Sequence, residues 1–368
     1  MRTELSKASK IIIKLGSSVI DNRDETIINE ICTSITKFLK ESKRVILVTS
    51  GAISQGMKIM DVQNRPRDIK KLQSLAAVGQ QKLMLMYERI FSEHDFQIAQ
   101  VLITHNDIND RVRYLNIKGT LEELLNNGVI PIINENDVVS TEEIKFGDND
   151  NLASMIANLV NADLLIILTD QKGMYDKNPD GYKEARLINR IDIADLKDFN
   201  SDFSTQSEIG TGGFITKIQA AKRAALSNTY TVIANGLEKN ILSNIFVNEN
   251  TGTLFIPSEK KISAKKQWLD TTDSRGSIII DDGACKAICD NNSLLLVGVS
   301  GVEGYFERGD VIQCMDNNHS CIAKGIANYS SGDVMKAQGK TADAIAEELG
   351  NEFVKELIHV DNLIVIET

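Results

Sequence analysis

The chain has 368 residues and a formal net charge of -10, from 41 Lys+Arg against 51 Asp+Glu. Hydrophobic residues make up 42% and charged residues 25%, which are globular values and exclude a disordered chain. No run reaches the roughly 18 apolar residues of a membrane span, and the acidic surplus argues against broad nucleic-acid binding. The length predicts two domains.

The cysteines and the N-terminal segment indicate where the protein works. The five cysteines are scattered, with no Cys-x-x-Cys and no zinc-like His spacing, so we expect reduced thiols. The apolar run near the start has only five residues before Lys14, too few for a signal-peptide core. Both features predict a cytoplasmic protein.

Short apolar runs alternate with longer helical patterns in the first half of the chain, which is typical of βαβ units and a mostly parallel sheet. We expect strands at 11–15, 45–49, 98–104, 129–134 and 164–169, and helices at 25–40, 69–91, 109–126 and 151–161. A further helix is expected at 213–226, with short strands near Thr231 and Leu254. In such sheets ligands bind at the carboxyl ends of the strands.

The first two strand ends carry groups that suit anions. Lys14 is followed by the glycine turn at Gly16, and a cation beside exposed N–H groups favours a phosphate. Ser50 and Gly51 follow the second strand and enter a helix, whose free N–H groups and hydroxyl can hold an anion. Taken alone, each feature is equally compatible with a solvated edge lysine or a plain helix cap.

Three later segments carry carboxylates and amides. Asn134 and Asp137 follow the run VIPII, and the segment 147–151 (GDNDN) stands immediately before a helix. The latter lacks the glycine and distal glutamate of a calcium loop, which excludes that interpretation. Thr169 and Asp170 end the strand LLIILTD.

A glycine-rich turn opens the helix near residue 213. Its sequence GTGGFITK places Lys217 one turn into the helix, after glycines that allow close backbone approach to a pyrophosphate. It is not a Walker motif, because Gly-Lys-Ser/Thr does not follow at the required spacing. Two lysines, two glycine turns and a carboxylate–amide cluster at one sheet edge favour phosphoryl transfer, which depends on positioning and charge neutralisation.

The composition changes after Pro257. We expect a linker at 258–275 and a small β-rich domain at 276–368, with a core of about 276–353 and a C-terminal tail, after an α/β domain at 1–257. Strands are expected at 277–280, 294–297, 310–314 and 322–327. From residue 276 onward there are six basic and fifteen acidic residues, so the last quarter carries nine of the ten net negative charges.

Several motifs occur in the order and approximate spacing of one known family. LAAVGQ (75–80), INENDVV, IKFGDNDNLA, LTDQKGMY and GTGGFITK resemble those of the glutamate 5-kinase family in the amino-acid kinase superfamily. GSIIIDDGACKAI and GYFERGDVIQC resemble the PUA domain that many such kinases carry. The resemblance covers nearly the whole chain and implies a three-layer α/β/α sandwich followed by a small β-rich PUA-like domain.

The resemblance also implies a reaction and the residues that perform it. The reaction is transfer of the γ-phosphoryl group of ATP, with Mg²⁺ carried on the ATP phosphates, to the side-chain carboxylate of L-glutamate, the first step toward proline. Lys14, Lys217 and Asp150 match catalytic positions. The glutamate-binding positions are Ser50, Gly51, Asn134, Asp137, Asp148 and Asn149. The ATP-binding positions are Lys14, Thr169, Asp170, Thr211, Gly212, Gly213, Phe214, Ile215, Thr216 and Lys217. Phe214 stands where the family pattern has Met.

Other partners and functions follow from the same resemblance. It implies feedback inhibition by proline and a homo-oligomer, a tetramer or dimer, with no membrane partner. The alternatives are another carboxylate kinase, for acetylglutamate or aspartate, and an RNA-binding role of the PUA-like module. The acidic composition of that module disfavours RNA as a partner, because RNA binding needs a basic face.

Overall fold

The computed structural model describes residues 2, 4–21, 25–140, 149–177, 179, 181–196, 213–257, 268–269, 272–337, 340 and 355–366. The chain forms two compact units, Met1–Ile262 and Ser263–Thr368. The division falls within the segment expected to be a linker. Over the described residues, none of the helices has the length and apolar character needed to span a bilayer.

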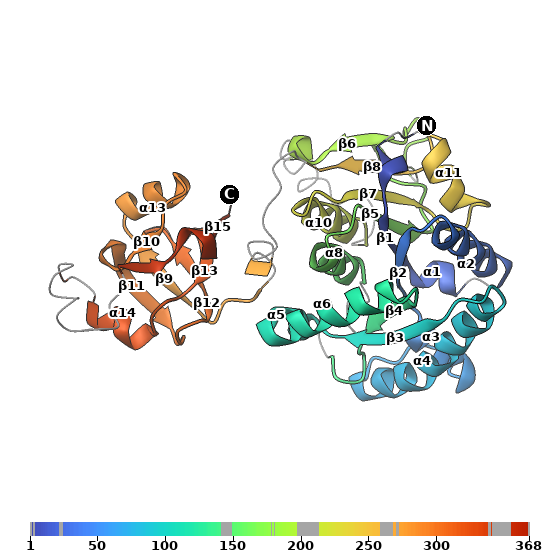
Figure 1. Ribbon diagram of the computed structural model, residues 1–368, viewed down its shortest axis with the longest axis horizontal. Helices are drawn as coiled ribbons and strands as arrows, with labels where there is room; N and C mark the ends of the chain where they lie inside the picture. Colours follow the sequence, from blue (N-terminus) through green and yellow to red (C-terminus); the bar gives the residue numbers. More distant parts are fainter. Residues whose placement is uncertain are drawn as a thin grey trace. The chain divides into compact units, whose positions relative to one another are not determined.

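The N-terminal unit is built on an eight-stranded sheet with the order β3-β4-β2-β1-β5-β7-β8-β6 (Figure 1). The strands are β1 (Lys10–Leu15), β2 (Arg44–Val48), β3 (Ile98–Ile103), β4 (Ile130–Glu135), β5 (Leu164–Thr169), β6 (Arg190–Asp192), β7 (Tyr230–Asn235) and β8 (Thr253–Ile256). The first five and β7 are parallel, and β8 runs antiparallel to β7. The prediction of a mostly parallel sheet is confirmed, and its five strands end within one residue of their expected ends.

Helices cover both faces of this sheet, which makes three layers (Figure 1). One layer holds α1 (Ser17–Ile20), α2 (Glu25–Lys40), α3 (Ala52–Ile59), α4 (Ile69–Ser92) and α11 (Ile241–Val247). The other holds α6 (Arg111–Asn126), α8 (Asn149–Val160) and α10 (Gly213–Ala225), and α5 (His105–Asn109) precedes α6. The helix expected at 109–126 is α6, which starts at Arg111 because Asp110 caps it by accepting a hydrogen bond from the Arg113 N–H at 2.9 Å; the short helix α5 before it was not expected.

The alternation of side chains along β1 decides which layer receives the lysine. Ile11, Ile13 and Leu15 belong to the core packed against α2, α4 and α11. Because successive side chains of a strand point to opposite faces, Lys14 lies on the other face, beneath α8 and α10. The strand therefore carries a buried cation into the layer where the GDNDN and GTGGFITK segments begin their helices.

Two glycines allow α3 to lie directly against α4. A Cβ added at Gly56 would come within 1.9 Å of the Leu75 carbonyl oxygen, and one at Gly79 within 1.8 Å of the Ala52 carbonyl oxygen. The two helix backbones therefore touch at these points. This contact sets where the N-terminal end of α3, directly after Ser50 and Gly51, lies relative to α4.

The C-terminal unit contains a five-stranded sheet with the order β11-β9-β12-β13-β15 and a two-stranded sheet of β10 and β14. Its elements are β9 (Gly276–Ile280), α13 (Asp282–Cys289), β10 (Leu294–Leu295), β11 (Val299–Gly304), β12 (Val311–Met315), β13 (Cys321–Ile326), α14 (Ser331–Ala337), β14 (Glu356–Ile358) and β15 (Leu363–Val365). The strands expected at 277–280, 310–314 and 322–327 are confirmed. The strand expected at 294–297 stops at Leu295, where a 3-10 turn begins.

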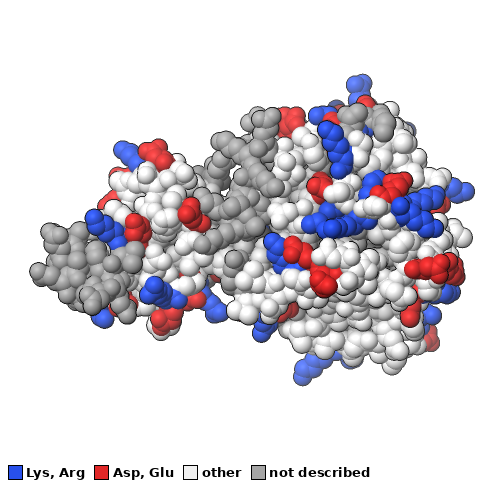
Figure 2. Space-filling view, in the orientation of Figure 1, with Lys and Arg blue, Asp and Glu red and all other residues white. Residues whose placement is uncertain are grey.

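The sheets of this unit extend beyond the core expected at 276–353. β14 pairs with β10, and β15 pairs with β13, so residues expected to form a tail complete both sheets. The reason is hydrophobic: Leu357, Ile358 and Leu363 belong to the buried core of the unit, together with Phe306. On the face shown in Figure 2, acidic and basic side chains of this unit are interspersed.

Candidate active site

The carboxyl ends of four adjacent strands, β4, β2, β1 and β5, form one edge of the sheet. Asn134 ends β4, Thr49 and Ser50 follow β2, Lys14 lies near the end of β1, and Thr169 ends β5. Lys14 is in register with Val48 on one side and Ile167 on the other. The chain order of the sheet reverses between β1 and β5, which is where ligands bind in open α/β sheets.

An ion triad lies at the centre of this edge. Asp150 Oδ1 is 2.6 Å from Lys14 Nζ, and Asp150 Oδ2 is 2.9 Å from Lys217 Nζ. The Asp150 side chain is fully buried, and the Lys14 and Lys217 side chains are 6% and 13% exposed. The structure thus brings together all three residues that the sequence marked as catalytic, from β1, α8 and α10.

Polar contacts between α8 and α10 hold Lys217 beside Asp150. The Asn158 side-chain amide donates to the Arg223 carbonyl at 3.0 Å, and Arg223 donates to Asn151 Oδ1 at 3.1 Å. Arg223 lies six residues after Lys217, so both bonds join α10 to α8 beyond the triad. Lys217 is therefore positioned by its helix rather than by a loop.

The two lysines decide the charge state of Asp150. Burial alone would raise the pKa of this carboxyl, but the opposing charges of Lys14 and Lys217 outweigh burial and lower the pKa to about 2. Asp150 is therefore a carboxylate at neutral pH. Each lysine has three N–H donors and gives one of them to Asp150.

A second polar cluster links β4 to α8. The Asn149 side-chain amide donates to the Thr49 carbonyl at 2.6 Å and to Asn134 Oδ1 at 2.8 Å. Asn134 Oδ1 also accepts from the Glu135 backbone N–H at 2.9 Å. Two of the residues expected to bind glutamate are thus in direct contact, on the β2–β4 side of Lys14.

Ser50 and Gly51 lie at the turn between β2 and α3. The Ser50 hydroxyl is buried and has no hydrogen-bond partner among the described residues. Gly51 has φ +96°, and a Cβ there would come within 2.8 Å of Ile20 Cγ2, so the turn requires glycine. The turn leaves Ser50 beside the strand edge with an unused hydroxyl.

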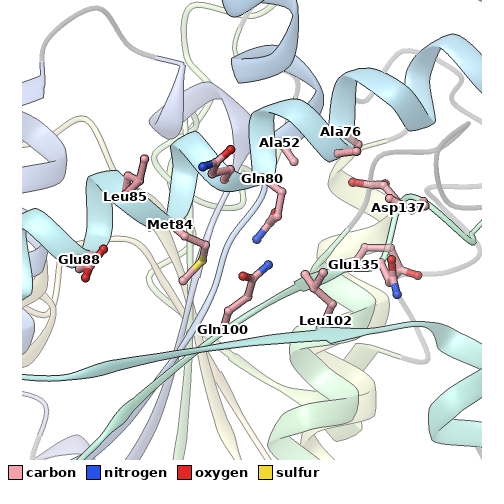
Figure 3. Close-up of a pocket in the computed structure, with 14 residues that line it drawn as sticks. Ala52, Ala76, Gln80, Met84, Leu85, Glu88, Gln100, Leu102, Glu135 and Asp137 are labelled. Carbon is pink, nitrogen blue, oxygen red and sulfur yellow. The ribbon is translucent and has the colours of Figure 1, made fainter.

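Asp137 lines a pocket of about 400 Å³ between α4 and the β3–β4 edge (Figure 3). In Figure 3, Asp137 and Glu135 lie at one end of this pocket, Glu88 at the other, and Gln80 and Gln100 between them. Carboxylates at one end and apolar side chains such as Met84 and Leu102 along the walls suit a small ligand with a cationic group.

Thr169 and Asp170 lie on the opposite side of Lys14, at the end of β5. Thr169 is buried and donates from its hydroxyl to Asp170 Oδ1 at 3.0 Å, while Asp170 is exposed. The Thr169 carbonyl accepts from Gly236 N–H at 2.8 Å, which joins the ends of β5 and β7. These expected ATP-binding residues are therefore separated from the Asn134–Asn149 cluster by β1.

The remaining expected site residues are only partly described. Asp148, Thr211 and Gly212 lie outside the described residues. Gly213 and Phe214 begin α10, Ile215 is 57% exposed in its first turn, and Thr216 is half-buried.

Two residues of α4 support the site and were not identified from the sequence. Gln80 Oε1 accepts from Asn134 Nδ2 at 2.8 Å. The buried Tyr87 hydroxyl shares a 2.8 Å hydrogen bond with Thr49 Oγ1, and burial raises the pKa of Tyr87. Gln80 is the last residue of the LAAVGQ motif, and this motif was the sequence signal that could have identified it. The rule that ligands bind at the carboxyl ends of strands does not identify a side chain on a helix.

Comparison with known proteins gives the family. The amino acid kinase family model matches residues 9–235, and the PUA domain model matches residues 276–349. A glutamate 5-kinase of Marinomonas sp. (strain MWYL1) is 42% identical over 372 residues, covering 100% of both chains. The chain belongs to the glutamate 5-kinase family.

Other relatives in the glutamate 5-kinase family agree. The Janthinobacterium sp. (strain Marseille) and Paraburkholderia phymatum glutamate 5-kinases are 44% and 43% identical, again over 100% of both chains. Among solved structures, a Giardia lamblia carbamate kinase bound to AMP-PNP has a TM-score of 0.48 and 15% identity, covering 68% of this chain and 99% of its own. The two family models show an amino acid kinase fold with a C-terminal PUA domain, as the resemblance implied.

Proposed function

We propose that the protein transfers the γ-phosphoryl group of ATP to the side-chain carboxylate of L-glutamate, giving L-glutamyl 5-phosphate, the first step toward proline. The observation that carries this proposal is the buried Lys14–Asp150–Lys217 triad at the point where the sheet order reverses. Membership of the glutamate 5-kinase family identifies the acceptor.

The proposed chemistry needs charge neutralisation and no general base. A glutamate side chain with an ordinary pKa of about 4.3 is already ionised at neutral pH, so it can attack without losing a proton. The obstacle is the approach of one anion to another. Lys14 and Lys217 donate to the transferring phosphoryl oxygens, and Asp150 holds both ammonium groups in place.

Glutamate would bind on the β2–β4 side of Lys14. Ser50, Gly51, Asn134, Asp137, Asp148 and Asn149 are its proposed contacts. Asp137 supplies a carboxylate for the ammonium group, and the unused Ser50 hydroxyl can donate to a carboxylate. This side would orient the γ-carboxylate toward Lys14.

ATP would bind on the β5 side, at Thr169, Asp170 and residues 211–217. Mg²⁺ would be carried by the ATP phosphates, where it neutralises negative charge. Both Asp150 oxygens pair with lysines, so this carboxylate supports the lysines rather than a metal ion.

A hydroxamate assay tests the function directly. The protein is incubated with ATP, Mg²⁺, hydroxylamine and L-glutamate, and in parallel with N-acetylglutamate or aspartate. We expect glutamyl hydroxamate with L-glutamate alone. Product with one of the other acids and none with L-glutamate would contradict the proposal.

The remaining proposals concern regulation, domains and location. We infer a catalytic domain at 1–257, a PUA-like domain at 276–368, feedback inhibition by proline and a homo-oligomer, a tetramer or dimer. The test compares a chain that ends at Pro257 with the full chain. Activity, proline inhibition and mass in solution are measured for both, which assigns each property to one part or the other.

All five cysteines are free thiols, which supports a reducing, cytoplasmic location.

A further inference from the structure

Three side-chain amides form a continuous chain across three elements of the site. Gln80 of α4 accepts from Asn134 of β4 at 2.8 Å, and Asn134 accepts from Asn149 of α8 at 2.8 Å. Asn134 and Asn149 are at most 8% exposed. Because an amide can donate from one end and accept at the other, such a chain has a direction, and the direction decides what it offers a ligand.

Backbone groups fix this direction at two points. The Thr49 carbonyl can only accept, so Asn149 must direct Nδ2 toward it. The Glu135 backbone N–H can only donate, so Asn134 must direct Oδ1 toward it. Asn134 Nδ2 then faces Gln80, which must present Oε1. The assignment of these amide atoms therefore rests on partners that cannot be turned around.

Gln80 keeps this orientation at a cost to its own hydrogen bonding. Its Nε2 is buried and has no hydrogen-bond partner among the described residues. Leaving a buried donor without a partner lowers the stability of the fold. Turning the Gln80 amide would bring Nε2 against Asn134 Nδ2, donor against donor, so the side chain is locked as an acceptor.

The direction of the chain determines the chemistry of Asn149. Both N–H bonds of its amide are used, one by the Thr49 carbonyl and one by Asn134 Oδ1. Asn149 can therefore offer a ligand only its oxygen, Oδ1, which accepts hydrogen bonds. An acceptor suits an ammonium group and repels a carboxylate.

We propose that Gln80 is a positioning residue that holds Asn134, and through it Asn149, in the direction that the Thr49 carbonyl and the Glu135 N–H set, so that Asn149 presents Oδ1 to the ammonium group of the amino-acid substrate. The inference rests on the proposed function and deepens it. It divides recognition of the substrate: Asn149 and Asp137 take the ammonium group, and Ser50 takes a carboxylate. Gln80 thereby contributes to selection of an amino acid over a plain dicarboxylate.

The test compares L-glutamate with glutarate, which has the same two carboxylates and no ammonium group. In the full-length protein, KM for L-glutamate and Ki for glutarate are measured for the wild type, Gln80→Met and Gln80→Glu. Gln80→Met removes the acceptor, and Gln80→Glu keeps an acceptor oxygen of the same reach. Gln97→Met is the matched control, because Gln97 is exposed and is not among the residues that line the pocket.

We expect Gln80→Met to raise KM for L-glutamate about tenfold, as for a lost hydrogen bond, with little change in Ki for glutarate or KM for ATP. Gln80→Glu and Gln97→Met should keep the ratio of the glutarate Ki to the L-glutamate KM within about threefold of the wild-type value. Thermal unfolding of each variant shows whether it is folded, and Gln80→Glu still tests the acceptor if Gln80→Met is unstable.

Three results would overturn the role of Gln80 while leaving the proposed function intact. The first is an unchanged ratio of the glutarate Ki to the L-glutamate KM in Gln80→Met, and the second is an equal loss of affinity for both acids in that variant. The third is a Gln80→Glu variant that behaves like Gln80→Met. Lack of wild-type turnover with L-glutamate would instead overturn the proposed function, and the inference with it.

Discussion

The carboxylate of Asp150 lies 2.6 Å from the ammonium group of Lys14, and neither side chain is more than 6% exposed. This contact joins the first turn of α8 to the end of β1 at the centre of the strand edge. Lys217 completes the group from α10. A buried carboxylate between two cations holds both of them at the same place, which a polyanionic reactant requires.

Lys217→Ala should lower kcat far more than it raises KM for ATP. Loss of one preorganised donor at a developing charge costs about 10² to 10³ in kcat. Steady-state kinetics with both substrates measure the effect, and Lys222→Ala, later on the same helix, is the control. An equal loss of nucleotide affinity would show that Lys217 acts in ground-state binding.

Asp150 should make the unfolding free energy fall in acid. Its folded-state pKa of about 2 lies below the ordinary 3.8, so the unfolded chain binds the proton more readily. Asp150 contributes its full stabilisation, about 2 kcal/mol, above about pH 4. This contribution is lost as the pH falls toward 2.

Comparison with Asp150→Asn isolates that contribution. The variant leaves two buried lysines without their partner, which should destabilise it at neutral pH by roughly 3 kcal/mol or more. Urea unfolding followed by circular dichroism should show this deficit shrinking between pH 5 and pH 2. A deficit that stays constant over that range would contradict the assigned pKa.

Ser50→Ala should weaken glutamate binding without weakening the fold. The Ser50 hydroxyl makes no hydrogen bond to the described residues, so its removal costs the free protein little. If it donates to the substrate, KM for L-glutamate should rise about tenfold. Kinetics and thermal unfolding measure the two effects separately.

Ser54→Ala is the matched contrast, four residues further along. Its hydroxyl hydrogen-bonds to Asp21 and to the Gly51 carbonyl, so its loss should destabilise the protein by about 1 kcal/mol. A Ser50→Ala variant that lost as much stability and no glutamate affinity would rule out the proposed contact.

Gly56→Ala should destabilise the protein strongly, because the new Cβ would come within 1.9 Å of the Leu75 carbonyl oxygen and force α3 and α4 apart. We expect a loss of about 3 kcal/mol or more. Gly119→Ala on the exposed face of α6 meets nothing within 4 Å and should stabilise by up to about 1 kcal/mol through helix propensity. The melting temperatures of the two variants show whether Gly56→Ala destabilises the protein and Gly119→Ala stabilises it.

Local patterns predicted much of the N-terminal unit. Buried parallel strands are short, continuous apolar runs, so β1 and β5 were recognisable along the chain, as was the change of composition before the C-terminal unit. The short helix α5 was not predicted, and α6 starts two residues later than expected because Asp110 caps it, a role that is not apparent until its capping bond is known. The strands β14 and β15 were missed because they are three residues long and pair with distant partners.

The amino-acid sequence by itself determined the class of sheet, the strand ends that carry polar groups and, through its motifs, the family. Those properties depend on residue type and spacing along the chain. Only the tertiary structure decided that Lys14 faces α8, that Asp150 lies between two lysines, and that Gln80 orients Asn134 and Asn149. These relations join residues from 15 to more than 130 positions apart, and they exist only because helix packing and strand order bring those residues to one edge.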